Sequence, residues 1–384
     1  MTKIKNIELA AQRIKSAIEN KEKIVLYGDA DLDGTVSVVL LKDTIELLGG
    51  KVFMVYFPDR EIEGYGINAK ALRLIKQKAK KSNVLLVVLD CGIANLEEAQ
   101  LAKKLKIDLI IADHHQPHKD LPLADIIVCP KQKGDKYPFK DLANAGIAFY
   151  LCREMLGSKF VKKEKDFLTL AALATIADMM KQEKDNKMII DRGLEYLKQN
   201  KRPGLKFFWK SGLVSKCAQE RDVVQRINSI LGSSGIKNHK IEIYNFLVAD
   251  DIKKAEKIVS RLVKKNKEKQ RRVLKMIDKV EKSANLDSPI IFFGSPDWKI
   301  NLLGSAASKI ENKYKKPVFL YKKGIKNSRG AVRVPTKLNA VLAMSKSSDI
   351  LLTYGGHPPA AGFNLANKNI DEFESRLIKY FKKK

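Results

Sequence analysis

The stretch GDADLDG, from Gly28 to Gly34, decides the fold because one element ends in it and the next begins. It follows the apolar run at 24–27, which predicts a buried strand. Asp29, Asp31 and Asp33 stand at alternate positions, and on an extended segment this spacing places all three carboxylates on one side. The final glycine allows a tight turn into a helix. The stretch therefore predicts a strand, an acidic loop and a helix in succession.

The three carboxylates of this loop predict a bound cation. Like charges this close repel one another, so a cation is needed to stabilise them. An EF-hand calcium loop is excluded because the glutamate that it requires is absent: Leu40 and Lys42 occupy the two candidate positions. A solvated acidic turn on the surface is the alternative interpretation.

Two further strand ends carry similar side chains. Asp90 follows the apolar run at 84–89, and Asp113, His114 and His115 follow the run at 109–112. In an open parallel sheet, ligands bind beyond the carboxyl ends of the strands. Carboxylate oxygens suit Mg²⁺ or Mn²⁺, and an added imidazole nitrogen favours Mn²⁺. The sequence thus predicts a divalent-metal enzyme, with one imidazole on a metal and the other turned toward the substrate.

The first half of the chain predicts an α/β fold with a parallel sheet. Apolar runs alternate with helical patterns, and each right-handed crossover between parallel strands places a helix on the sheet, so both faces are covered. The expected strands are 23–28, 51–57, 83–90, 107–112 and 125–129, and the expected helices are 4–20, 35–49, 67–81 and 95–105.

The rest of the chain divides into a connector and a second domain. We expect a catalytic domain over 1–200, a loop-rich and helical connector over 201–284 and a smaller α/β domain over 285–384. The connector is loop-rich over 201–240 and ends in a charged helix. Asp178 closes an apolar helical run in the first domain, and on its own it would also suit an ordinary helix end.

Two glycine-containing motifs in the second domain suggest contacts with phosphate. SRGAVR brings Arg329 and Arg333 close to what we expect to be a glycine turn, and the arginine fork suits phosphate oxygens. GGHPPAAG adds His357 as a donor, while Gly355 and Gly356 allow a ligand to approach the backbone. Turns that carry solvated arginines are the alternative.

Composition points to a polyanionic substrate. Lys and Arg number 73 against 44 Asp and Glu, an excess of 73 − 44 = 29 positive charges. A field of this sign attracts nucleic acid, although a lysine-rich compositional bias would give the same count. The four cysteines form no paired motif, and no apolar stretch is long enough to cross a membrane. We therefore expect a cytoplasmic protein with no membrane partner.

Taken together, these motifs resemble the DHH phosphoesterase superfamily and, within it, the RecJ-type single-strand exonucleases. The chain matches in order with GDADLDG, with VVLDCG around Asp90, with ADHHQP and with ATIADMM around Asp178. The segments PDREIEGYGIN, YPFKDLANAG and QRIN look like RecJ-type segments. GGHPPAAG resembles the signature of the DHH-associated domain, so the resemblance covers nearly the whole chain.

The resemblance implies a two-metal site between the domains, with two Mn²⁺ or Mg²⁺ ions. Asp90 would bridge the ions, Asp113 would support the site from behind, and His115 would contact the scissile phosphate or act as an acid. Arg333 and His357 would hold the terminal phosphate or the nucleotide next to it. The metal ligands that it implies are Asp29, Asp31, Asp33, Asp90, His114 and Asp178.

The implied function is a single-stranded DNA exonuclease, with RNA as a second possible substrate, that releases mononucleotides from the 5′ end in repair, recombination or replication. Its partners would then include replication or repair proteins. The arginine motif lacks the serines that usually flank it, and no segment forms an oligonucleotide-binding barrel, so we expect a compact form with lower processivity and end preference. A nuclease for short oligonucleotides, a phosphatase of small nucleotides and a non-catalytic replication scaffold remain alternatives. The polarity of digestion and the oligomeric state stay open.

Overall fold

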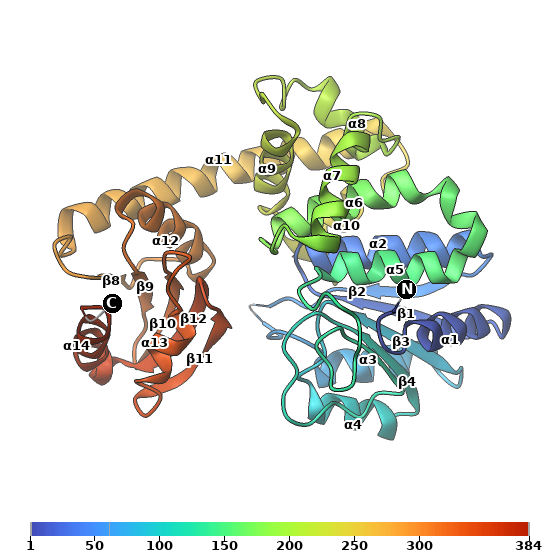
Figure 1. The fold of residues 1–384 in the computed structure, drawn as a ribbon, viewed down its shortest axis with the longest axis horizontal. Coiled ribbons are helices and arrows are strands. Elements are labelled where there is room, and N and C mark those ends of the chain that lie inside the picture. Colours follow the sequence, from blue (N-terminus) through green and yellow to red (C-terminus); the bar gives the residue numbers. More distant parts are fainter. Residues whose placement is uncertain (1, 61, 383–384) are drawn as a thin grey trace. The chain divides into compact units, whose positions relative to one another are not determined.

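A computed structural model describes residues 2–60 and 62–382 of the chain (Figure 1). It divides into two compact units, Met1–Lys264 and Lys265–Lys384, and the division falls inside the long charged helix α11 (Ile252–Ser283). The α/β fold class predicted from the sequence is confirmed in both units.

The first unit is built on a five-stranded sheet in the order β2-β1-β3-β4-β5, and every pair in it is parallel. All five strands predicted from the sequence are present. A helix follows each of the first three strands and carries the chain back to the same end of the sheet, and an irregular segment does so between the last two strands. The strands are β1 (Lys23–Gly28), β2 (Val52–Tyr56), β3 (Val84–Leu89), β4 (Ile107–Ala112) and β5 (Ile126–Val128).

Helices cover both faces of this sheet and give it two separate cores (Figure 1). Helices α1, α2 and α5 pack on one face, and α3 and α4 pack on the other. Residues of β3 are buried on both sides, which explains their unbroken apolar sequence. The helices are α1 (Ile7–Glu19), α2 (Leu32–Leu47), α3 (Ala69–Ala79), α4 (Leu96–Lys104) and α5 (Asn144–Leu156).

The segment after the sheet is mostly helical, and the region expected to be loop-rich, 201–240, contains two short helices joined by turns. Three short helices and a two-stranded hairpin occupy 203–247. Each helix is too short to be stable alone, and packing of its apolar side against the first unit stabilises it. The elements are α6 (Glu164–Ala177), α7 (Lys184–Leu197), α8 (Pro203–Lys210), α9 (Glu220–Leu231), β6 (Ile236–Lys237), β7 (Lys240–Ile241) and α10 (Glu242–Leu247).

The second unit holds a mixed sheet in the order β11-β12-β10-β9-β8, in which only β8 and β9 are parallel. The glycine turn expected in SRGAVR is wrong: Gly330 lies inside β10, where the Phe363 ring occupies the space that a side chain would need. GGHPPAAG forms a hairpin whose turn is Pro358–Pro359. The elements are β8 (Ile291–Ser295), α12 (Ile300–Tyr314), β9 (Val318–Lys323), β10 (Asn327–Arg333), α13 (Ala340–Ser345), β11 (Leu351–His357), β12 (Ala360–Ala366) and α14 (Ile370–Phe381).

Two composition-based expectations bear on the whole chain. All four cysteines are free thiols, and three of them are buried. Among the helices that the structure describes, none combines the length and the apolar character needed to span a membrane.

Candidate metal centre

Three acidic residues stand one position beyond the ends of three neighbouring strands, and the sheet itself holds their backbones. The amide of Asp29 donates to the carbonyl oxygen of Leu89 at 3.2 Å. The amide of Asp90 donates to the carbonyl oxygen of Ala112 at 3.0 Å, and the amide of Asp113 donates to the carbonyl oxygen of Val128, in β5, at 3.1 Å. Each acid therefore follows β1, β3 or β4 while its backbone is still bonded to the next strand, which fixes its position.

The start of α2 places the other two carboxylates of the acidic loop. Asp31 caps the helix, because its side chain accepts from the amide of Gly34 at 3.0 Å. Asp33 lies in the first turn, and its two oxygens accept from the amides of Asn144 and Ala145 at 2.8 Å each. These amides begin α5, so a helix N-terminus stabilises the Asp33 carboxylate.

His114 is oriented so that one ring nitrogen faces the acids. Its Nδ1 lies 3.1 Å from the carbonyl oxygen of Leu142, a partner to which only a protonated nitrogen can donate. Nε2 then lies 3.3 Å from Asp90 Oδ1 and 3.7 Å from Asp178 Oδ2. Asp178 itself caps the carboxyl end of α6. The structure thus brings together the six side chains that the resemblance implied as metal ligands.

These side chains form two adjacent sets, and within each set the possible ligand atoms lie within 4.8 Å of one another. Asp90 belongs to the first set and contacts His114 of the second at 3.3 Å, so it lies between the two. Asp90 and the histidine pair His114 and His115 make a third possible group. The first set is Asp29, Asp31 and Asp90, and the second is Asp33, His114 and Asp178.

Two observations show that the centre fits divalent cations. Asp90 Oδ1 and Asp178 Oδ2 are buried and accept no hydrogen bond from the described residues, which is costly for a polar atom. Arg60 donates from Nε to Asp29 at 2.8 Å and from Nη2 to Asp31 at 2.9 Å, so a guanidinium lies against carboxylates of the first set. The acceptors without donors and the guanidinium bound to the first set both indicate that the centre needs positive charge. Its oxygen and imidazole ligands suit Mn²⁺ or Mg²⁺.

The pKa values of the cluster report the same shortage of positive charge. Burial raises the pKa of Asp33 and of Asp90 well above the ordinary value, and repulsion from neighbouring carboxylates adds to it. Burial together with the charge of Asp31 raises the pKa of Asp178 to about 7. Ionised together, these groups destabilise the fold unless a cation neutralises them.

A second, smaller group surrounds His115. Burial opposes ionisation of Asp113, but a hydrogen bond from His115 and its charge lower the pKa of Asp113 to about 2. The same bond, 2.8 Å between Nδ1 and Oδ1, raises the pKa of His115 in spite of burial. The Tyr65 hydroxyl lies 3.2 Å from His115 Nδ1 and 3.3 Å from Nε2. The hydrogen bond to Asp113 therefore favours the protonated form of His115, the form that can donate a proton.

Sequence reasoning missed Arg60 and Tyr65, although PDREIEGYGIN had been recognised as a RecJ-type segment. The available signal was topological. The carboxyl end of strand β2, at Tyr56, lies at the same end of the sheet as the strand ends that carry the acids. The loop after β2 therefore also reaches the site.

We expect Mn²⁺ to stabilise the protein more at pH 7.5 than at pH 5. The folded pKa of Asp178, about 7, lies above its ordinary value, so its contribution to stability is complete below about pH 4 and is lost as pH rises through 7. A cation recovers that loss. At a hundredfold excess over its Kd, Mn²⁺ should add about 2.7 kcal/mol, which is roughly 5–10 °C in Tm at pH 7.5. Thermal melts with and without Mn²⁺ test this, and equal shifts at both pH values would contradict it.

The second unit places the predicted phosphate contacts on one face of its sheet. Arg333 pairs with Ala360 across β10 and β12, and Ala360 pairs with His357 across β12 and β11. Residues paired across antiparallel strands point to the same face, so Arg333 and His357 lie on one side, two strands apart. Arg329 lies four residues from Arg333 on the same strand and shares that face.

The face between these side chains is lined by small residues. Gly355 pairs with Gly362, and no atom lies within 4 Å of where a side chain of Gly355 would start. We call the surface formed by Arg329, Arg333, Gly355, His357 and Gly362 the shelf. Gly356 alternates to the other face, where its φ of +132° and the backbone of β12 leave no room for a side chain.

Arg333 is the strongest candidate for an anion contact on the shelf. It donates from Nε to Ser308 at 3.1 Å and from Nη1 to the carbonyl oxygen of Val332 at 2.8 Å. No carboxylate of the described residues forms an ion pair with it, and burial lowers its pKa. A half-buried guanidinium without a counter-ion is suited to bind a phosphate.

Comparison with known families matches both units. Residues 23–175 match the DHH family, N-terminal domain, and residues 286–383 match the DHHA1 domain.

Named relatives agree with this match. The chain is 36% identical to the single-stranded-DNA-specific exonuclease RecJ of Bacillus subtilis over 97% of its own length and 47% of that protein. It is 27% identical to the protein of the same name from Thermus thermophilus, over 98% of the chain and 54% of that protein. The chain thus spans about half the length of these relatives. A crystal structure of exonuclease RecJ bound to manganese superposes with a TM-score of 0.78 at 26% identity, over 99% of this chain and 95% of that one.

Proposed function

The chain belongs to the DHH family, and from this membership and the geometry of its metal centre we propose that it is a metal-dependent exonuclease that hydrolyses single-stranded DNA to mononucleotides. The observation that carries the proposal is the pair of adjacent ligand sets with Asp90 between them. Two-ion centres of this kind serve phosphodiester hydrolysis. Similarity to proteins named as single-strand exonucleases supports the choice of substrate.

The six ligands would hold two Mn²⁺ or Mg²⁺ ions, and Asp90 would contact both. When bound, the ions supply an activated water and neutralise charge on the attacked phosphate. His115 donates a proton to the leaving oxygen, and Asp113 holds its ring in the orientation and charge state that this requires. Arg60 lies on Asp29 and Asp31 at the edge of the centre, where its guanidinium can pair with a phosphate oxygen of the substrate.

The shelf of the second unit would bind the nucleotide chain. Arg333 and His357 would contact a phosphate, while the glycines between them leave room for the sugar and the backbone. Cytoplasmic location and replication or repair proteins as partners are part of the same proposal.

Incubation of the pure protein with Mn²⁺ and end-labelled single strands tests the proposal. We expect mononucleotides from long single-stranded DNA, no digestion of the matching duplex and no activity with EDTA. Cleavage restricted to substrates of two or three nucleotides would instead assign a short-oligonucleotide nuclease. Absence of hydrolysis for all these substrates would favour the non-catalytic scaffold.

We expect Arg333→Ala and His357→Ala to raise the apparent KM for an oligonucleotide without changing metal affinity. Loss of a charge-assisted hydrogen bond costs about 1.5–3 kcal/mol, so the expected increase is roughly ten- to hundredfold. A small chromogenic phosphodiester, which needs only the metal centre, should be affected less. Arg376→Ala is the matched control, because Arg376 lies in the same unit on α14 and pairs with Asp349. A loss of metal affinity in the Arg333 variant would contradict this role.

We also expect the binding of a single strand to weaken steeply with salt. Each neutralised phosphate releases counterions, so log affinity should fall with log salt at a slope of about −0.7 for each contact. Fluorescence anisotropy with a labelled oligonucleotide between 50 and 200 mM salt, roughly the range over which such losses are large, measures the slope. A slope near zero would show that the 29 excess positive charges are a compositional bias.

A further inference from the structure

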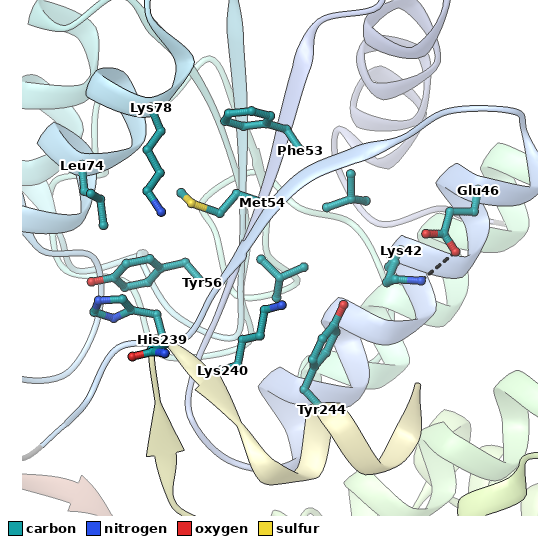
Figure 2. A pocket seen from close by; sticks show the side chains of 13 residues that line it. Lys42, Glu46, Phe53, Met54, Tyr56, Leu74, Lys78, His239, Lys240 and Tyr244 are labelled. Carbon is teal, nitrogen blue, oxygen red and sulfur yellow. Dashed lines mark hydrogen bonds and ion pairs between the residues drawn. The ribbon is translucent and has the colours of Figure 1, made fainter. Parts of the chain in front are cut away.

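A cavity of about 350 Å³ runs along strand β2, and it shares no lining residue with the metal centre (Figure 2). All five residues of β2, Val52 to Tyr56, line it. Successive side chains of a strand point to opposite faces, so a cavity that reaches all five lies at the edge of the strand and not on a face. β2 is the end strand of its sheet, and among the described residues no further strand pairs with this edge.

The hairpin of β6 and β7 shows that this edge can bind another backbone. The amide of Phe57, just beyond β2, donates to the carbonyl oxygen of His239 at 2.9 Å. The His239 ring also stacks on Tyr56, with 4.1 Å between the ring centroids. Along a strand, the N–H and C=O groups of successive residues point alternately to its two sides. Val55, two residues before Phe57, therefore directs its N–H and C=O to the same side as Phe57 does. Among the described residues, this is the one backbone hydrogen bond between the β2 segment and the hairpin, and the cavity begins beside it.

The charges around the cavity are mostly positive and come from both sides of the sheet. Lys78 belongs to α3 and Lys42 to α2, and these helices pack on opposite faces. Figure 2 shows the two lysines on opposite sides of β2. Lys240 of the hairpin is a third cation, and the one lining carboxylate, Glu46, is paired with Lys42 at 2.6 Å.

We propose that the edge of β2 is a docking site for an extended, acidic segment of a partner protein, which pairs with β2 as a sixth strand. Alternate side chains of such a segment would reach Lys78 on one face and Lys42 or Lys240 on the other. Its backbone would use the groups that Val55 directs into the cavity, as in other cases of strand addition. The half-buried side chains Phe53 and Met54 would cover its apolar residues. This inference does not depend on the proposed nuclease activity.

Two other occupants fit less well. A second copy of the chain would bring its own three lysines against these three, which is unfavourable. A nucleic acid strand would pair with the lysines but would leave the backbone edge of β2 without a matching partner.

The probe is a fluorescein-labelled decapeptide in which Asp or Glu alternates with Val or Ile, and binding is measured by anisotropy. We expect saturable binding to the wild-type chain and roughly tenfold weaker binding to Lys78→Glu, a substitution at an exposed position of α3. Lys104→Glu, at an exposed position of α4 away from the cavity, is the matched control and should bind as wild type does. The same peptide with alternate backbone amides N-methylated should lose at least the same factor. Hydrogen exchange should show protection of the Val55 amide when the peptide is bound.

Each contrary result identifies a different error. No saturable binding of the peptide, or equal binding of the N-methylated peptide, would overturn the strand-addition proposal. A single-stranded oligonucleotide that binds the same edge, displaces the peptide and is weakened by Lys78→Glu would assign the surface to nucleic acid. A dimer in sedimentation velocity that is lost when the β2 edge is changed would assign it to self-association.

Discussion

Asp90→Ala is expected to abolish metal-dependent hydrolysis while leaving the fold intact. Asp90 lies between the two ligand sets, and the interior already disfavours its charge, as its raised pKa shows. Removing it should therefore not unfold the chain through a lost stabilising contact, but it would remove the ligand that we propose both ions share. Loss of several kcal/mol of charge stabilisation at the phosphate corresponds to a rate reduction of roughly a thousandfold or more.

Turnover in Mn²⁺, metal occupancy and a thermal melt together test this prediction. In the absence of metal, the variant should melt at or above the temperature of the wild-type chain, because a buried carboxylate without a partner has been removed. Asp120→Ala, at an exposed loop position, is the control that should keep full activity. Retention of a tenth of wild-type turnover would show that Asp90 is not the ligand shared by the two ions.

Gly34→Ala is expected to disable the same centre through the backbone. A Cβ at this position would lie 2.5 Å from the carbonyl oxygen of Asp29 and 2.7 Å from its amide nitrogen. No side chain can yield there, so β1 and α2 must separate. The strain should cost about 1–3 kcal/mol in the free energy of unfolding. A displacement of about 1 Å in the ligands should reduce turnover about a hundredfold.

Chemical denaturation and turnover measure the two effects separately. Gly49→Asn is the control: Gly49 has a φ of +81° that asparagine tolerates, and no atom lies within 4 Å of its missing Cβ. Wild-type activity and stability in the Gly34 variant would show that the close approach of α2 to Asp29 is not needed.

Much of the first unit was predictable because its signals are local. Each strand of the parallel sheet is built around a run of apolar residues, and each predicted metal ligand except Asp178 lies in or near the loop that directly follows a strand. Because the strands are parallel, those loops meet at the carboxyl end of the sheet, so the sequence alone predicted the cluster. Asp178 is different: it ends a helix, and only its resemblance to a known motif distinguished it from an ordinary helix end.

The features that could not be predicted depend on contacts between distant segments. Arg60 matters because its loop lies over Asp29, and nothing in the neighbouring residues shows that. The sequence suggested a turn at Gly330. The Phe363 ring that makes glycine necessary inside the strand lies far along the chain, so the residues next to Gly330 carry no signal of it. The short helices over 203–247 are stable only when packed, so their sequence signal is weak.

The bonding of each acid to the next strand also sets the order in which the metal centre can assemble during synthesis. Asp29 is fixed only after β3 has inserted beside β1, and Asp90 only after β4 has joined. The second ligand set is completed by Asp178, which leaves the ribosome last among them. A growing chain has no complete centre until most of this unit has emerged, because its domains fold as units. The order of the strands therefore delays assembly of the proposed metal centre until most of the first unit has been synthesised and folded.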